Sequence, residues 1–307
     1  MPTSQGDTEQ PVGRLMKTSI TLVTGCSTGI GRALAEEFHR RGHVVYATGR
    51  RVSTLSALEA RGIRTATLDV TDAENIRRLQ ARLQHDGVTV ALLINNAGYG
   101  TLGPLAELPM DELRLQFETN VFGLVALVQA LLPDMVRQRS GRIVNISSVS
   151  GVLPTPFAGA YCATKAAVNA LSDSLRMELQ PFGIEVITVQ PGGVASQFSA
   201  TAAKRCHLKD ASLYAAVTDA IMARVGASQA RAMPTEVFAH EMADAVLAPN
   251  PQAVVRIGHH SLLLPFLKRW LPTRALDRVL SRRFRLDRLS QCVFRPNPPP
   301  VPIERCS

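Results

Sequence analysis

The 307-residue chain is predicted to fold as a single α/β domain, a doubly wound and mainly parallel β-sheet with helices on both faces. Three observations predict this class. Short apolar, β-branched runs alternate with longer amphipathic helical patterns, as in right-handed βαβ units. A glycine-rich turn follows the first apolar run. The composition is that of an ordinary globular protein, with 46% hydrophobic and 19% charged residues.

The expected strands and helices alternate along most of the chain. Gly42 closes the first helix, Asp72 is an N-cap for the second, and Pro181 with Gly183 ends the last long helix. Strands are expected at residues 19–23, 44–48, 64–68, 90–94, 142–146 and 185–189, with 254–257 as a seventh strand at the sheet edge. Helices are expected at residues 32–41, 73–84, 111–137 and 159–180.

Three glycines, Gly25, Gly29 and Gly31, fall where the first strand passes into the first helix. Glycine permits a tight turn and lets the backbone approach a pyrophosphate, while the helix N-terminus offers N–H groups and a positive dipole. The spacing is G-x-x-x-G-x-G, which differs from the common G-x-G-x-x-G. The turn is not a P-loop, because Arg32 follows the last glycine in place of a lysine. It is therefore a candidate dinucleotide site.

The second strand is followed by Arg50 and Arg51, and no acidic residue lies between Val44 and Arg51. NAD-selective sites place a carboxylate here for the ribose 2′-hydroxyl, whereas an arginine accommodates a 2′-phosphate. The guanidinium fork matches phosphate geometry. We expect NADP(H) as the cofactor; the alternative is that both arginines are solvated at the start of a loop.

Tyr161 and Lys165 are four residues apart within an expected helix, so their side chains share one face. A free tyrosine has a pKa near 10, and a neighbouring ammonium favours its phenolate. Beside a nicotinamide, such a phenol donates and accepts the proton of an alcohol or carbonyl group. A tyrosine and a lysine also share a helix by chance, so the pair gains its meaning from the glycine turn upstream.

From about residue 18 to residue 193 the chain resembles the classical short-chain dehydrogenase/reductase family. The resemblance rests on ordered matches along the βαβ pattern: the T-G-x-x-x-G-x-G turn, Asp69, Asn95 to Gly98, Asn120, Ser148, Tyr161 with Lys165, and Pro191 with Gly192. It implies a Rossmann-type domain, NADP(H) and the interconversion of an alcohol and a carbonyl compound. The alternative is a catalytically silent cofactor sensor or scaffold, which has no physical need for the complete set Asn120, Ser148, Tyr161 and Lys165.

The resemblance also implies roles for individual residues. Tyr161 is the expected general acid/base, and Lys165 lowers its pKa and holds the nicotinamide ribose. Ser148 is expected to hydrogen-bond the substrate oxygen, since the family's spacing favours it over the adjacent Ser147. Asn120 is expected to help retain a water that relays protons. The expected cofactor-binding residues are Gly25, Ser27, Thr28, Gly29, Ile30, Gly31, Arg50, Arg51, Asp69, Val70, Asn96, Ala97, Gly98, Tyr161, Lys165, Pro191, Gly192, Val194 and Ser196.

More narrowly, the chain is similar to a subgroup that holds retinol dehydrogenases, 17-beta-hydroxysteroid dehydrogenases and acyl-dihydroxyacetone-phosphate reductases. This similarity implies a lipophilic substrate that is steroid-, retinoid- or acyl-lipid-like. Residues 197–233 occupy the position of the family's substrate lid. The basic run 204–209 within them either meets a phosphate head group or is a solvated turn.

The net charge of +9 at pH 7 is concentrated late in the chain, where arginines alternate with Leu, Phe and Trp. This pattern suits helices at an anionic membrane surface; alternatively, its apolar face caps the substrate pocket. No nucleic-acid recognition motif is present, so nucleic acid is not an expected partner. The expected divisions are a flexible lead at 1–16, the Rossmann-type domain at 17–258, basic amphipathic helices at 259–295 and a Pro-rich tail at 296–307.

The cysteines and the N-terminus indicate a reducing, cytoplasmic setting. The five cysteines are widely spaced without a C-x-x-C motif, which argues against a disulfide framework and a zinc site. The chain shows no signal-peptide pattern and no apolar run of about 18 residues. A homodimer is expected through helices 111–137 and 159–180, because small or apolar residues surround the first half of the second helix.

Overall fold

Seven parallel strands form one sheet in the computed structural model, which describes residues 18–208, 211–226 and 232–289. The strand order is β3-β2-β1-β4-β5-β6-β7, so the predicted seventh strand lies at an edge. The predicted lead 1–16 and tail 296–307 fall outside the described residues. The strands are β1 Thr18–Val23, β2 Val45–Gly49, β3 Arg64–Thr67, β4 Val88–Asn95, β5 Gly141–Ile146, β6 Ile184–Pro191 and β7 Val254–Ile257.

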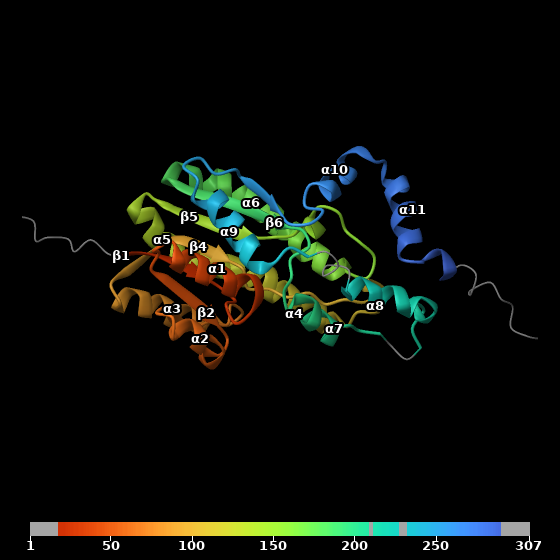
Figure 1. The fold of residues 1–307 in the computed structure, drawn as a ribbon, viewed down its shortest axis with the longest axis horizontal. Helices are drawn as coiled ribbons and strands as arrows, with labels where there is room; N and C mark the ends of the chain where they lie inside the picture. Colours follow the sequence, from red (N-terminus) through yellow and green to blue (C-terminus); the bar gives the residue numbers. More distant parts are fainter. Residues whose placement is uncertain (1–17, 209–210, 227–231, 290–307) are drawn as a thin grey trace, which may run out of the picture.

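Helices cover both faces of this sheet, which confirms the doubly wound class (Figure 1). One core cluster joins α1, α2 and α9 to the sheet, and a second joins α3, α5 and α6 to its other face. The helices are α1 Gly29–Arg40, α2 Ser56–Glu59, α3 Ala73–His85, α4 Met110–Phe117, α5 Gly123–Gln138, α6 Gly159–Leu179, α7 Phe198–Lys204, α8 Thr218–Gly226, α9 Thr235–Leu247, α10 Leu263–Trp270 and α11 Thr273–Arg283.

The register of the sheet brings the ends of neighbouring strands together. Val23 at the end of β1 pairs with Ala47 of β2 and with Ile94 of β4. β1 lies between β2 and β4, so the chain winds outward in both directions from this point. The loops that follow β1 and β4 therefore meet at the carboxyl edge, where open α/β sheets bind their ligands.

Local signals correctly predicted the first helices. Asp72 caps α3, because its side chain accepts hydrogen bonds from the backbone N–H groups of Glu74 and Asn75 at 2.8 and 3.3 Å. The helix predicted at 111–137 is helical over its whole length but consists of three segments. A π-helical turn, η3 (Glu118–Phe122), separates α4 from α5.

Helix α9 was missed by the sequence analysis. Its buried residues Phe238, Met242 and Val246 recur every four positions, and Ala239 and Ala243 accompany them. This spacing was a usable signal for a helix packed on the sheet. The helix contacts α1 and fills that face of the core.

One helix, Met110–Gln138, is long and apolar enough to cross a membrane by length and composition alone. Its α5 part contributes Leu124, Leu127 and Leu131 to the core cluster against the sheet. Packing in the core thus accounts for the apolar composition of this helix.

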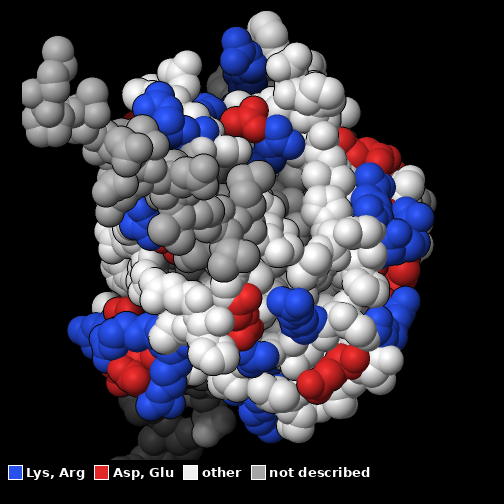
Figure 2. Space-filling model, turned by 90° about the vertical axis from the view of Figure 1, so that its left-hand side faces the viewer, with Lys and Arg blue, Asp and Glu red and all other residues white. Residues whose placement is uncertain are grey.

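The two ends of the molecule differ. Figure 1 shows α7, α8, α10 and α11 gathered at the end toward which the strands run. The opposite end shows Lys and Arg intermixed with Asp and Glu among the described side chains (Figure 2).

Candidate active site at the carboxyl edge of the sheet

The turn between β1 and α1 forms a cradle in which side chains have no room. Gly25 and Gly29 have φ angles of 72° and 59°, in the left-handed region that glycine adopts readily. A Cβ atom on Gly31 would lie only 2.3 Å from the carbonyl oxygen of Gly25. The backbone is therefore packed closely where a pyrophosphate is expected.

The N-terminus of α1 lacks a side-chain cap. Thr28 at the N-cap makes no side-chain cap hydrogen bond, and the first turn contains no acidic residue. Neither the N-cap side chain nor an acidic residue of the first turn therefore competes with an anion for the N–H groups and the positive end of the helix dipole. Ser27 instead hydrogen-bonds Thr54, with 2.9 Å between the hydroxyl oxygens. The cradle and the uncapped helix together fit a dinucleotide phosphate.

The ends of β2, β3 and β4 surround this turn. Arg50 and Arg51 are exposed directly after β2. Asp69, after β3, accepts hydrogen bonds from the backbone N–H and the hydroxyl of Thr71, and the neighbouring Val70 is buried. These residues line the edge on which the nucleotide part of a cofactor would lie.

The loop after β4 is tied to the glycine turn by hydrogen bonds. The amide of Asn96 donates to the carbonyl oxygens of Thr24 and Gly25 at 2.8 and 3.3 Å. The backbone N–H of Ala97 donates to the Thr24 hydroxyl at 2.9 Å. Asn96 thus holds the phosphate cradle in position, and Gly98 follows as an exposed residue.

Tyr161 and Lys165 lie on α6 beside Ser148, which follows β5. The Lys165 ammonium lies 5.9 Å from the centre of the Tyr161 ring and donates to the Ile146 carbonyl at 2.7 Å. The Ser147 hydroxyl donates to the carbonyl of Lys165 at 2.9 Å and is thereby engaged in the fold. The Ser148 hydroxyl interacts with the phenol of Tyr161.

Burial dominates the electrostatics of this cluster. It raises the pKa of Tyr161 to about 12, opposed by interaction with the Ser148 hydroxyl and by the positive charge of Arg224. Burial also lowers the pKa of Lys165 to about 8. Both shifts favour the neutral forms, as expected for groups removed from water. The lowering of the Tyr161 pKa by Lys165 therefore stays a prediction for the protein with its cofactor bound.

Asn120 lies in the π-helical turn between α4 and α5, and its amide is fully engaged. It donates to the Tyr99 carbonyl at 2.9 Å and to the Thr164 hydroxyl at 3.0 Å, and it accepts from the Tyr99 N–H at 3.0 Å. A Cβ on Gly98 would lie 3.0 Å from the Asn120 carbonyl oxygen and 3.7 Å from the Lys165 ammonium. Gly98 thus leaves room beside both polar groups.

The loop after β6 returns to the phosphate cradle. Pro191 ends β6, and the Gly192 N–H donates to the carbonyl of Ile257 at 2.8 Å. Val194 is buried, and the Ser196 Cβ lies 3.1 Å from the position that a Cβ on Gly29 would take. The predicted cofactor residues that follow β1 and those that follow β6 therefore meet at one site.

Two side chains from the predicted lid reach this site and were missed by the sequence analysis. The ring of Phe198 on α7 lies 5.0 Å from the ring of Tyr161, centre to centre. Arg224 on α8 donates from Nε to the hydroxyl of Thr155 at 3.0 Å. No local pattern distinguishes this phenylalanine or this arginine from others in the chain.

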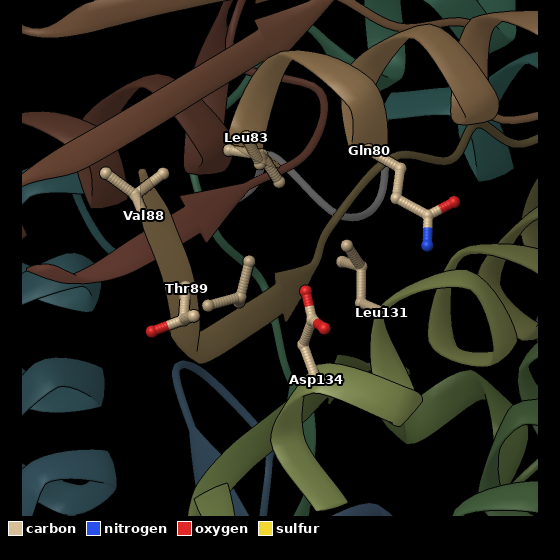
Figure 3. A pocket seen from close by; sticks show the side chains of 7 residues that line it. Gln80, Leu83, Val88, Thr89, Leu131 and Asp134 are labelled. Atoms are coloured by element: carbon tan, nitrogen blue, oxygen red, sulfur yellow. The ribbon is translucent and has the colours of Figure 1, made fainter. Parts of the chain in front are cut away.

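A separate small pocket lies between α3, β4 and α5, far from these residues (Figure 3). It opens at the start of β4, beside Val88 and Thr89, whereas the site lies at the opposite ends of the strands. Its polar side chains have partners of their own, since Gln80 donates to the Ala130 carbonyl and Asp134 pairs with Arg137. We assign no chemistry to this pocket.

Comparison with known proteins identifies the family. The sequence pattern of the short chain dehydrogenase family matches residues 19–207, and the chain belongs to this family. A 3-ketodihydrosphingosine reductase of Bacteroides thetaiotaomicron is 38% identical over 184 residues, which are 60% of this chain and 67% of that protein. An NADPH-dependent 1-acyldihydroxyacetone phosphate reductase of Schizosaccharomyces pombe is 37% identical over 178 residues, 57% of this chain and 60% of that protein.

Solved structures share this fold. A short-chain dehydrogenase from Streptomyces avermitilis matches with a TM-score of 0.73 and 31% identity, covering 90% of this chain and 99% of that one. A serine dehydrogenase in complex with NADP+ matches with a TM-score of 0.68 and 28% identity, covering 78% and 94%. The predicted Rossmann-type class is confirmed.

Proposed function

We propose that this short-chain dehydrogenase is an NADP(H)-dependent oxidoreductase that interconverts an alcohol and its ketone or aldehyde on a lipophilic substrate. The observation that carries the proposal is the grouping of Ser148, Tyr161 and Lys165 beside the uncapped, glycine-lined turn of α1. One bound dinucleotide could therefore place its phosphates at the turn of α1 and its nicotinamide beside Tyr161. Bound NADP(H) supplies or accepts the hydride.

The side chains divide the remaining work. The Tyr161 phenol donates a proton to the substrate oxygen during reduction and accepts one during oxidation. The Ser148 hydroxyl hydrogen-bonds that oxygen as negative charge develops on it. The Lys165 ammonium, anchored to the Ile146 carbonyl, supplies positive charge beneath the phenol. Asn120 fixes the turn beside Gly98, where a water between Asn120 and Lys165 would relay protons.

The preference for NADP(H) is supported by the two exposed arginines after β2, Arg50 and Arg51. A guanidinium there suits a ribose 2′-phosphate. The yeast relative is by name NADPH-dependent, and the serine dehydrogenase was solved with NADP+.

A lipophilic substrate is supported by the names of two relatives, which act on a ketodihydrosphingosine and on an acyldihydroxyacetone phosphate. Steroids and retinoids remain in the proposed range. The lid helices α7 and α8 and the C-terminal helix α11 bring further apolar groups toward the site. Leu280 and Phe284 pack with Val217 and Ile221 of the lid region and with Phe157, which precedes α6.

We also propose a homodimer through α4, α5 and α6. Helices α4 and α6 lie against each other, and their surfaces expose Leu115, Phe122 at the π turn, and Met177. Phe122 and Met177 are 54% and 67% exposed, and a second subunit packed on these helices would cover them. Light scattering at micromolar concentration measures the mass that checks this proposal.

We further propose that the protein is cytoplasmic and contacts a membrane surface, and helix α10 supports the membrane contact. Helix α10 has no buried residue, and it exposes Leu263, Phe266 and Trp270 together with Lys268 and Arg269. Apolar and cationic groups on one short helix suit an anionic interface. By contrast, α11 buries Leu276 and Phe284 follows it into the lid cluster, which supports the cap interpretation for that helix.

The experiment that tests the function is NADPH consumption against ketosteroids, retinals, acyl-dihydroxyacetone phosphate and aliphatic ketones, with the Tyr161→Phe variant as a matched control. Phenylalanine fills the same space, so we expect turnover to be lost while NADPH binding is retained. Turnover above about a tenth of wild type in the variant contradicts the assignment of Tyr161, since a lost general acid costs about 10²-fold or more. Binding of NADPH without turnover of any carbonyl compound favours the silent sensor.

A further inference from the structure

Arg224 reaches the candidate active site from the lid. It lies on α8, and its Nε donates to the Thr155 hydroxyl at 3.0 Å. Thr155 belongs to the loop between η4 (Val149–Gly151) and α6, the two elements that follow Ser148 and carry Tyr161. The guanidinium is therefore held beside the loop that joins Ser148 to the helix of Tyr161.

The charge of Arg224 acts directly on the first turn of α6. It opposes the rise in the pKa of Tyr161 and, likewise, that of Cys162. Burial in turn lowers the pKa of Arg224 itself. The guanidinium and the phenol are thus close enough for their charges to interact, although they are 63 positions apart in the chain.

No carboxylate in residues 18–208, 211–226 and 232–289 forms an ion pair with Arg224. Asp219, the acidic residue of α8, pairs with Arg285 instead. Arg205, another cation of the lid, pairs with Glu112 at 3.3 Å and stacks over the Tyr99 ring at 4.4 Å. Arg224 thus differs from Arg205 in lacking a neutralising carboxylate.

A half-buried cation without a counter-charge is costly, because it has lost water and gained no partner. Among the residues that the structure describes, Thr155 engages one nitrogen of the Arg224 guanidinium, and the other N–H groups keep the fork geometry that matches a phosphate or carboxylate. An anion in this place would restore the charge balance.

We propose that Arg224 binds an anionic group, a phosphate or a carboxylate, that the carbonyl substrate carries close to its reacting carbon. This inference rests on the proposed function and narrows its substrate class. Arg224 would then be a specificity-determining residue, which orients the carbonyl toward Tyr161 through the anion. The basic run 204–209, considered from the sequence as a phosphate contact, is the competing location, and its Arg205 is already neutralised.

The test compares an acyl-dihydroxyacetone phosphate, the same compound without its phosphate, and a long-chain 3-oxo acid. Wild type should reduce an anionic compound with a KM at least about 10-fold below that of the neutral one. The Arg224→Gln variant should raise the KM of the anionic compound by about 10- to 100-fold, the range for a lost charged hydrogen bond. It should change the KM of the neutral compound by less than about threefold, and Arg224→Lys should recover part of the loss. The anionic compound with the lower KM in wild type shows whether Arg224 binds a phosphate or a carboxylate.

The matched control is Arg205→Gln, which removes the same charge from the lid and should leave the anion preference unchanged. If Arg205→Gln abolishes the preference and Arg224→Gln does not, the anion site lies in the basic run and the proposal is wrong. Equal slowing of charged and neutral ketones by Arg224→Gln, with a shifted pH profile, also overturns it, because Arg224 would then only adjust Tyr161.

A binding measurement separates this inference from the proposed function. Calorimetric titration of the phosphate compound into the Tyr161→Phe variant, with and without Arg224→Gln, requires no turnover. Binding that depends on Arg224 supports the anion site even if no carbonyl compound is reduced. Equal binding to both variants refutes the anion site even if wild type reduces ketones.

Discussion

At the scale of single residues, the reacting groups are shaped by burial. Tyr161 and Lys165 both shift toward their neutral forms, with pKa values of about 12 and about 8. The phenol therefore remains protonated throughout the physiological range and is ready to donate a proton. The ammonium, in contrast, titrates just above neutral pH.

These pKa directions predict the pH dependence of carbonyl reduction. Below about pH 8, Lys165 is charged and Tyr161 protonated, so the rate should be nearly constant; it should fall as pH rises through about 8 because the ammonium is lost. The Lys165→Arg variant keeps its charge to much higher pH and should move this limb beyond pH 10. Initial rates from pH 6 to 10 provide the measurement, and a limb that stays near 8 in the variant contradicts the assignment.

The lowered pKa of Lys165 also predicts how the stability of the fold depends on pH, and this dependence is opposite in sign to that of the reduction rate. The folded pKa of Lys165 lies below its ordinary value of 10.5, so the unfolded chain binds more protons between about pH 8 and that value. The contribution of Lys165 to the free energy of unfolding therefore rises with pH across this window.

A second residue-scale prediction concerns cofactor choice. Arg50→Asp should weaken NADPH binding by about 10- to 100-fold, because a charged hydrogen bond is lost and a repulsive carboxylate is introduced. NADH binding should change little or improve. Fluorescence titration of both cofactors measures the effect, with Arg283→Asp on exposed α11 as a control for the same change in net charge. Equal loss for NADPH and NADH would show that Arg50 does not contact the 2′-phosphate.

At the scale of elements, the glycine turn shows how strand ends and a helix start combine into a site. The turn is closed by Asn96, which follows β4, and by the exclusion of any side chain at Gly31. The π-helical turn η3 has a similar importance, because it places Asn120 against Tyr99 and Thr164. π-turns within helices recur at functional sites.

Gly31→Ala tests the cradle. The new Cβ would meet backbone oxygen at 2.3 Å, so the turn must shift. We expect a loss of about 1–3 kcal/mol in the free energy of unfolding, typical of overpacking, together with loss of NADPH binding. Gly226→Ala is the control, since no atom of the described residues lies within 4 Å of its Cβ position. Denaturant unfolding and NADPH titration measure both effects; normal NADPH binding by Gly31→Ala would refute the cradle.

At the scale of the whole molecule, the lid and the C-terminal helices form one end and the sheet's carboxyl edge faces them (Figure 1). The two C-terminal helices have different surroundings. α11 is joined to the lid by apolar packing and is followed by the Arg285–Asp219 ion pair, whereas α10 presents its apolar side chains to solvent.

This difference predicts which helix contacts membranes. Phe266→Ser with Trp270→Ser should reduce binding to anionic vesicles, because these side chains are 58% and 66% exposed and contribute little to the fold. The wild-type protein should bind anionic vesicles better than neutral ones. Salt should weaken this binding, since charges are screened within about 8 Å at physiological ionic strength. Val279→Ser, an exposed position on α11, is the matched control. Vesicle co-sedimentation gives the result, and identical binding of the double variant and wild type would leave α10 without this role.

The seven strands, the helices α1, α3 and α6, the cap at Asp72, the glycine turn and the family could all be predicted from the sequence. These features depend on local periodicity and on short motifs, which neighbouring residues specify. The sequence could not place Arg224 on Thr155, within reach of Tyr161, or Phe198 against the Tyr161 ring. Nor could it show that Arg205 pairs with Glu112, whereas Arg224 pairs with no carboxylate of the described residues. These contacts join residues far apart in the chain, so they depend on how the lid packs on the sheet and leave no local sequence pattern.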